Sequence, residues 1–301
     1  MLVWQAHKGR IESAAFSPDG TLLATTTGGT RVVRLWESNT GRLVRRLEGT
    51  SGSVQSVAFA PNAALFAAGT SEGIGVWDTI SWSRIAVLAL HTARELAFGS
   101  GSSPILIASN SPHTLLWEDT GRPSDSGANP RPHRHEFPRM GSAQAIHISP
   151  NETTVATSST RETNLWAVAT TAHVRTLRNE QSSHRGAVRF SPDGRRIAFA
   201  HSKWLLVSDV EHAGPGPSWR VAAGTGRSPL VWAVNWSADG SSILTAGNDG
   251  TVRLWDSNTG AELKSFEWGI GKLYCAAFSP DGLTCAAGGE NGQVVIWDVD
   301  T

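Results

Sequence analysis

The stretch AVNWSADGSSILTAGNDGTVRLWDSNTGAELKSF, Ala233–Phe266, decides the fold. It contains four short runs in which apolar and polar residues alternate, and turn residues such as Ser, Asn, Asp and Gly separate the runs. This pattern predicts a unit of four short β-strands. Such a unit cannot cover both of its faces with its own side chains, so we expect it to pack against similar units.

The beginning of this stretch recurs along the whole chain. Seven related phrases of the type Phe-Ser-Pro-Asp-Gly place their large apolar residues at intervals of 39 to 50 residues, at Phe16, Phe59, Phe98, Ile148, Phe190, Trp236 and Phe278. An alternating run closed by tryptophan follows six of the seven phrases, and Ser208 takes the place of the tryptophan in the fifth. A period near forty residues is typical of propellers and solenoids.

These motifs resemble the WD40 repeat family, over the full length of the chain. The unit at Ala233–Phe266 is close to the family pattern, whereas units 3, 4 and 5 diverge from it. The resemblance implies an all-β fold, a seven-bladed β-propeller in a single domain over residues 1–301. The 22 arginines against 4 lysines suggest a GC-rich genome, such as that of a bacterium or a filamentous fungus, which agrees with a WD40 protein of bacterial type.

The phase of the repeat predicts how the ring closes. The last tryptophan, Trp297, lies close to the C-terminus, so the seventh unit lacks its outermost strand. The run Leu2-Val3-Trp4-Gln5-Ala6 at the N-terminus has the character of a fourth strand. We therefore expect residues 2–6 to complete the last blade and to remove two open strand edges. We therefore expect both ends of this sequence to fall within one blade, with no linker to another domain.

The resemblance also implies a buried hydrogen-bonded set of His, Asp and Trp in each blade. The first unit has His7 but Thr30 in place of the aspartate, and the sixth has Asp249 but Arg227 in place of the histidine. No unit carries the full set. Because an incomplete buried network is costly, we expect the ring to depend on apolar packing and on its 13 tryptophans, with His7 and Asp249 in structural roles.

Composition excludes several classes of function. The 26 basic and 26 acidic residues balance, so nothing in the overall charge favours nucleic acid, and no apolar run is long enough for a membrane helix. Only Cys275 and Cys285 could form a disulfide or a thiolate site, and both belong to one hairpin. No catalytic motif or phosphate-binding loop is present. We expect a cytoplasmic protein without cofactor, metal or enzymatic activity.

Two segments depart from the repeat. Residues 120–138, between the third and fourth strands of unit 3, are rich in Pro, Gly and Ser, and residues 211–220 occupy the same place in unit 5. Both are predicted to be surface loops, which could serve docking or be ordinary length variation. His133, His135 and Glu136 in the first loop would need a further ligand to hold a metal, so a solvated basic segment is the favoured interpretation.

The direction of the strands predicts a separation of charge. The aspartates of the Ser-Pro-Asp-Gly turns and the acids after the tryptophans fall on one face, which we call the bottom. The loops of the opposite, top face carry mostly basic residues: His7, Lys8, Arg10, Arg31, Arg94, Arg161, Arg185, Lys203, Arg227 and Lys272. A basic top face and an acidic bottom face are expected.

The resemblance implies a non-enzymatic scaffold that binds a protein or peptide on the top face. In such propellers, residues six and four before the large apolar residue of the first strand lie near the top rim and the channel mouth. From these positions, with aromatic side chains beside cations, we select Arg10, His184, Leu230, Trp232, Lys272 and Tyr274 as the partner-binding residues.

These six residues predict a partner that carries an acidic segment with an apolar anchor. We expect the propeller that binds it to be a monomer. The alternative for Trp232 and Tyr274 is packing between blades. Two other functions stay open. One is a regulatory or sensory domain of a larger signalling protein, and the other is a propeller enzyme such as a lactonase. A lactonase needs acidic or histidine ligands in the channel, and the channel-facing positions offer almost none.

Overall fold

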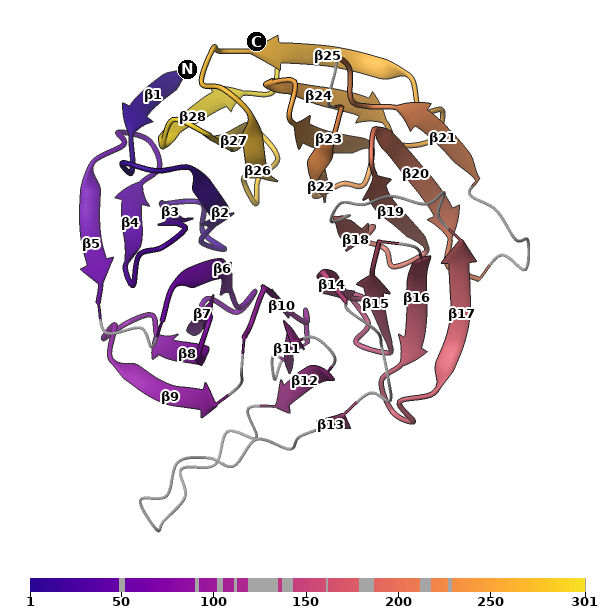
Figure 1. Ribbon diagram of the computed structural model, residues 1–301, viewed down its shortest axis with the longest axis horizontal. Helices are drawn as coiled ribbons and strands as arrows, with labels where there is room; N and C mark the ends of the chain where they lie inside the picture. Colours follow the sequence, from indigo (N-terminus) through magenta and orange to yellow (C-terminus); the bar gives the residue numbers. More distant parts are fainter. Residues whose placement is uncertain are drawn as a thin grey trace.

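Figure 1 shows the computed structural model as small antiparallel sheets arranged in a closed ring. The structure describes residues 1–48, 52–89, 92–101, 105–110, 113–118, 135–136, 143–160, 162–178, 187–211, 218–226 and 229–300. The loop predicted at 120–138 lies outside these residues except for 135–136, and residues 212–217 of the loop predicted at 211–220 also lie outside them. Among the residues described, no helix is long and apolar enough to cross a membrane.

Each sheet has four strands, ordered from the innermost to the outermost. Sheet 1 contains β2 (Ile11–Phe16), β3 (Leu22–Thr27), β4 (Val33–Glu37) and β5 (Leu43–Leu47). Sheet 2 contains β6 (Val54–Phe59), β7 (Leu65–Thr70), β8 (Gly73–Asp78) and β9 (Arg84–Ala89). Sheet 3 contains β10 (Glu95–Phe98), β11 (Ile105–Asn110), β12 (His113–Glu118) and β13 (His135–Glu136). Sheet 4 contains β14 (Ala145–Ile148), β15 (Thr154–Ser158), β16 (Glu162–Ala167) and β17 (His173–Arg178).

The other three sheets follow the same order. Sheet 5 contains β18 (Val188–Phe190), β19 (Arg196–His201), β20 (Trp204–Asp209) and β21 (Trp219–Ala222). Sheet 6 contains β22 (Val231–Trp236), β23 (Ser242–Gly247), β24 (Thr251–Asp256) and β25 (Glu262–Glu267). Sheet 7 contains β26 (Leu273–Phe278), β27 (Thr284–Gly289), β28 (Gln293–Asp298) and, on its outer edge, β1 (Leu2–Gln5).

The prediction of a seven-bladed propeller is wrong in the number of regular blades, and the difference lies in sheet 3. Six sheets are regular blades, but the outer strand of sheet 3, β13, has two residues and pairs with β12 only at Leu115 and Leu116. The sequence gives a reason: Pro132 and Pro138 flank this strand, and proline has no N–H to donate to a ladder. The ring therefore consists of six regular blades and one irregular sheet.

The expected closure by the N-terminus is confirmed. β1 pairs antiparallel with β28, with Leu2 opposite Ile296 and Gln5 opposite Gln293. The backbone N–H groups of Ala6 and His7 both donate to the carbonyl of Gly292, at 2.9 Å each. In Figure 1 the two chain ends lie side by side at this sheet. Residues from both ends of the chain thus form one sheet.

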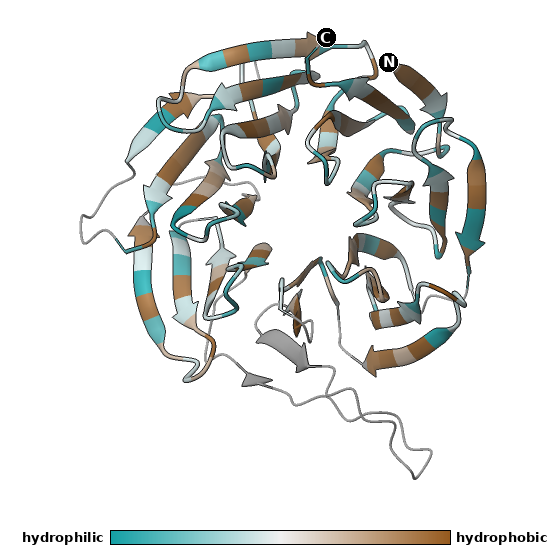
Figure 2. Cartoon of the chain, turned by 180° about the vertical axis from the view of Figure 1, so that it is seen from behind, coloured by the Kyte–Doolittle hydropathy of each residue, from teal (hydrophilic) through white to brown (hydrophobic). Residues whose placement is uncertain are grey.

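Apolar clusters fill the spaces between neighbouring sheets. Phe66 of sheet 2, which is fully buried, packs with Leu35 and Val33 of sheet 1. The cluster between sheets 7 and 1 joins Ile11 and Trp36 to Val294 and Ile296, with Trp4 against its edge. The outer strands alternate between hydrophobic and hydrophilic residues because only one of their faces is covered (Figure 2). Stacking of sheets therefore provides the core.

In sheet 1 a hydrogen-bonded set of His7, Thr25 and Trp36 takes the place of the incomplete His-Asp-Trp set. The Oγ1 atom of Thr25 lies 2.8 Å from Nε2 of His7 and accepts a 2.7 Å hydrogen bond from Nε1 of Trp36. His7 is 3% exposed. Burial, with a smaller effect of the Arg34 charge, lowers the pKa of His7 to about 4. His7 is therefore neutral near pH 7 and is not one of the top-face cations expected from the sequence.

Deletion of residues 1–6 should destabilise the whole ring. The deletion removes β1 and uncovers the edge of β28 and the apolar cluster beneath Trp4, at a cost on the order of 3 kcal/mol. Urea denaturation should show a lower midpoint and a broader transition. Val3→Ala is the control, because this outward-facing side chain contributes little to the core. An unchanged midpoint after the deletion would show that β1 does not close the ring.

The buried His7 predicts a pH dependence of stability. Its folded pKa lies below its unfolded value near 6.5, so the unfolded state binds more protons between these values and the free energy of unfolding decreases as the pH falls from about 6.5 to about 4. The protein should lose about 2–3 kcal/mol over this window through His7. Denaturant titrations near pH 7 and near pH 4.5 should show a smaller loss in His7→Gln, and an equal loss in both proteins would refute this role.

Candidate functional site

Three of the predicted partner-binding residues form one continuous surface. The rings of Trp232 on β22 and Tyr274 on β26 lie 5.8 Å apart between centroids. The guanidinium of Arg10, just before β2, lies 5.0 Å from the centre of the Tyr274 ring. Nε1 of Trp232 donates a 2.6 Å hydrogen bond to Oδ1 of Asn248, which fixes the indole. We call Arg10, Trp232 and Tyr274 the aromatic shelf.

The two predicted cations each have a carboxylate beside them. Nε of Arg10 lies 2.7 Å from Oε1 of Glu12, and this hydrogen bond raises the pKa of Arg10. Nζ of Lys272 lies 3.1 Å from Oε1 of Glu290, which raises the pKa of Lys272. Both cations stay substantially exposed, at 53% and 46% of their side chains. The surface around Arg10 and Lys272 is therefore less basic than the sequence alone suggested.

Of the other two predicted residues, Leu230 does not extend the shelf. Leu230 is 8% exposed, so little of its side chain can reach a partner. Its carbonyl accepts a hydrogen bond from the N–H of Asn248. His184 lies outside the described residues, as do Arg161, Arg185 and Arg227 of the predicted basic face.

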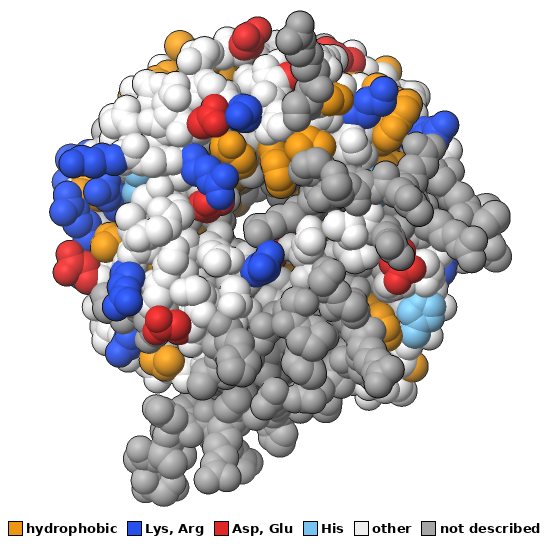
Figure 3. Space-filling view, viewed as in Figure 1, with side chains coloured by type: hydrophobic (Ala, Val, Ile, Leu, Met, Phe, Trp, Pro, Cys, Tyr) orange, Lys and Arg blue, Asp and Glu red, His pale blue; other side chains and the backbone are white. Residues whose placement is uncertain are grey.

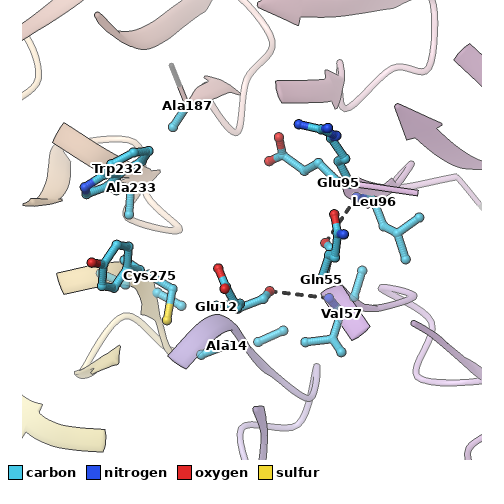
Figure 4. A pocket seen from close by; sticks show the side chains of 18 of the residues that line it. Glu12, Ala14, Gln55, Val57, Glu95, Leu96, Ala187, Trp232, Ala233 and Cys275 are labelled. Carbon is cyan, nitrogen blue, oxygen red and sulfur yellow. Dashed lines mark hydrogen bonds between the residues drawn. The ribbon is translucent and has the colours of Figure 1, made fainter. Parts of the chain in front are cut away.

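The aromatic shelf stands beside a cavity of about 940 Å³ that is lined by the inner strands. Figure 4 shows Glu12, Gln55 and Glu95 extending into it from different sheets, with Trp232 across from them. The residues four positions before the large apolar residue of the inner strand line it in six sheets: Glu12, Gln55, Arg94, Gln144, Trp232 and Tyr274. The sequence had placed this set near the channel mouth.

The expectation that the channel offers almost no acidic or histidine side chains is wrong. Oε1 of Glu95 on β10 lies 2.7 Å from Nη1 of Arg189 on β18, which joins sheets 3 and 5. Oε2 of Glu95 also accepts a 3.1 Å hydrogen bond from the N–H of Ile146. Nδ1 of His147 accepts one from the N–H of Phe190, at 3.2 Å. Burial, followed by the charge of Arg189, holds the pKa of His147 well below its usual value.

These side chains form part of a ring of hydrogen bonds between neighbouring sheets. The N–H of Val57 donates to Ser13, and the N–H of Leu96 donates to Ser56, at 3.3 and 3.2 Å. Ser13, Ser56 and Glu95 each lie three residues before the large apolar residue of their inner strand. The recurrence of polar residues at that position was the signal that could have revealed the ring. These side chains form hydrogen bonds to the next sheet, so their role is structural.

The site has no assembled metal centre among the residues that can be described. There, no group of three or more His, Cys, Asp or Glu side chains is placed to hold an ion. Cys275 lines the cavity as a buried free thiol, and burial raises its pKa to about 12, so it is protonated at neutral pH. His133 of the loop at 120–138 lies outside the described residues. The absence of enzymatic activity stays a prediction.

Small four-stranded sheets in a closed ring, with a polar cavity on the axis, define a β-propeller. The WD40 family model, "WD domain, G-beta repeat", matches residues 1–37, 41–78, 218–256 and 262–298, which together make up half of the chain. The protein belongs to the WD40 repeat family. The matched segments fall in sheets 1, 2, 6 and 7 and in the outer strand of sheet 5, in agreement with the divergence of units 3 to 5.

Known proteins of this family resemble the chain at low identity. It is 24% identical over 250 residues to the LST8 homologue of Drosophila melanogaster, covering 79% of this chain and 76% of that protein. It is 22% identical over 287 residues to the human serine-threonine kinase receptor-associated protein, covering 93% and 77%. An uncharacterised WD repeat-containing protein of Synechocystis sp. is 36% identical over 63 residues, only 21% of this chain and 18% of its own length.

Proposed function

We propose that this protein is a non-enzymatic scaffold that binds a protein or peptide partner through the aromatic shelf on the top face of its propeller. The observation that carries the proposal is the contact of Trp232, Tyr274 and Arg10, which brings two large rings and an exposed cation together from three sheets. Tryptophan, tyrosine and arginine are the residues most often responsible for binding energy at protein interfaces.

The geometry suits a partner that inserts an apolar side chain. Trp232 and Tyr274 are both partly exposed and both line the 940 Å³ cavity. The hydrogen bond from Trp232 to Asn248 holds the indole in place before binding, which lowers the entropy lost on association. An anchor residue of the partner would pack on the two rings and extend toward the cavity.

Acidic groups next to this anchor complete the proposed partner. A carboxylate of the partner would approach the exposed side of Arg10, or of Lys272, in competition with Glu12 or Glu290. Because each cation already has one carboxylate, the electrostatic contribution is modest and mainly orients the partner. Increasing salt should weaken the complex, but apolar contacts with the shelf should keep most of the affinity.

The relatives support a role in protein assemblies. The name of one relative describes it as associated with a serine-threonine kinase receptor, and that of another places it in the small ribosomal subunit. The proposal includes a monomeric propeller in the cytoplasm, where thiols such as those of Cys275 and Cys285 stay reduced. A regulatory or sensory domain of a larger signalling protein would use the same shelf.

Replacement of both Trp232 and Tyr274 by alanine should abolish partner binding. Each ring contributes about 2 kcal/mol or more if it is a binding hot spot. Quantitative mass spectrometry of proteins captured from the native host should show partners that are retained by the wild type and lost with the double variant. Circular dichroism and the melting temperature check that the ring is intact.

The matched control is Ile80→Ala. Ile80 is 91% exposed in the turn between β8 and β9, at the opposite end of the strands from the shelf. The Ile80→Ala variant should capture the same proteins as the wild type. A folded double variant that still captured every specific partner at full strength would remove the aromatic shelf from consideration.

A further inference from the structure

Arg34 in sheet 1 and Arg253 in sheet 6 occupy the same position in two blades. Each lies two residues before the tryptophan of its third strand, β4 or β24. Each donates through Nη1 to the carbonyl of an alanine that follows an outer strand: Arg34 to Ala6, and Arg253 to Ala223. The two guanidinium groups are therefore held by equivalent backbone carbonyl groups. The charged residues around each of them can be compared directly.

In sheet 6 the charge of Arg253 is balanced by two carboxylates. Oδ2 of Asp249 lies 2.8 Å from Nη1, and the two side chains are only 9% and 10% exposed. Oε2 of Glu262 lies 3.7 Å from Nε. Burial alone would raise the pKa of Asp249, but hydrogen bonds from Arg253, Thr251 and Thr225 hold it below its usual value. The chain itself supplies the anions that this arginine needs.

In sheet 1 the corresponding positions hold no carboxylate. Thr30 lies four residues before Arg34, where Asp249 lies four residues before Arg253. Leu43 is paired with Trp36, whereas Glu262 is paired with Trp255. The residue directly opposite Arg34 is Arg46, whereas Ser265 is opposite Arg253. Compared with sheet 6, sheet 1 therefore has two fewer negative charges and one more positive charge around this arginine.

This arrangement leaves an uncompensated positive charge. Like charges directly opposite each other on neighbouring strands are destabilising, and burial together with the Arg46 charge lowers the pKa of Arg34. Nε of Arg34 is shielded from solvent without a hydrogen-bond partner. Glu48, two residues after Arg46, makes no ion pair with it in the described part of the chain. Figure 3 shows Lys and Arg side chains gathered at this edge of the ring, over β4 and β5.

We propose that Arg34 and Arg46 form a second binding site, on the outer side of sheet 1, for the carboxylates of an acidic peptide segment of a partner protein. The partner's carboxylates pair with the partly exposed guanidinium of Arg34 and the exposed guanidinium of Arg46, and so supply the negative charge that Asp249 and Glu262 supply in sheet 6. This site is separate from the aromatic shelf, and it does not depend on the function proposed for the shelf.

A peptide fits this surface better than a free inorganic anion. The groups that balance the matching arginine in sheet 6 are carboxylates of a polypeptide. Apolar surface also lies beside the charges: Val44, two residues before Arg46 on β5, is 47% exposed. A guanidinium pairs well with the planar carboxylate group, and the neighbouring apolar surface offers contacts that phosphate or sulfate cannot use.

The test is fluorescence anisotropy of a labelled hexaglutamate peptide at low ionic strength, with the full chain and single variants. Arg46→Ser, which introduces the serine of sheet 6, should weaken binding about tenfold, the effect of losing one charge-assisted contact. Arg45→Ser is the matched control, because it removes the same charge from the opposite face of β5, where Arg45 is paired with the buried Leu35. Equal weakening by the two variants would overturn the proposal.

A second variant supplies the missing carboxylate from within the chain. Thr30→Asp changes the net charge by the same amount as Arg45→Ser, and should both raise the melting temperature and weaken peptide binding about tenfold. Unchanged binding by this variant would contradict the site.

Competition experiments identify the class of ligand. Inorganic phosphate and a hexaglutamine peptide should each compete at least about tenfold more weakly than unlabelled hexaglutamate. If phosphate competes as well as hexaglutamate, the surface is a general anion site and the assignment to an acidic peptide is wrong. If hexaglutamine competes equally, charge does not determine binding and the proposal also fails.

Discussion

The backbone pairing of β1 with β28 is the interaction on which the rest of the structure depends. It joins the first residues of the chain to the last strand, with Leu2 opposite Ile296, so sheet 7 contains both ends of the polypeptide. Each sheet has apolar faces that only its two neighbours can cover. If sheet 7 opened, the cluster of Ile11, Trp36 and Val294 between sheets 7 and 1 would lose one wall. Closure thus keeps the apolar faces of sheets 7 and 1 covered and completes the ring.

The repeat itself could be predicted from the sequence because each unit encodes its own strands and turns. The aspartates of the Ser-Pro-Asp-Gly turns show this locally: Asp193 accepts hydrogen bonds from Ser191 and Arg195 within the same turn. The closing strand was also predictable, because counting from Trp297 leaves one strand missing. Sheet 3 was not, because the length of β13 depends on a proline-rich stretch that lacks the pattern of the repeat.

The candidate sites were harder to predict because they depend on contacts between distant sheets. The sequence selected Arg10 six residues before the large apolar residue of its unit, and Trp232 and Tyr274 four residues before theirs. It could not show that Glu12 and Glu290 pair with the cations. It missed the Glu95–Arg189 pair, whose residues belong to different sheets. It also missed the contrast between Arg34 and Arg253, because that contrast lies in the residues on the neighbouring strand. The period of the repeat predicts where each residue lies in its sheet. The charge balance of a site depends on the residues of adjacent strands and sheets, which the period does not give.

Native-state hydrogen exchange of the β1 amides tests most directly whether this closure holds the ring together. If it does, β1 opens only when the whole ring unfolds, so its amides that bond to β28 should exchange as slowly as those of β27 in the middle of the same sheet. The two strands should also respond alike to low concentrations of denaturant. Exchange of the β1 amides about a hundredfold faster, while β27 and the other inner strands stay protected, would contradict the account.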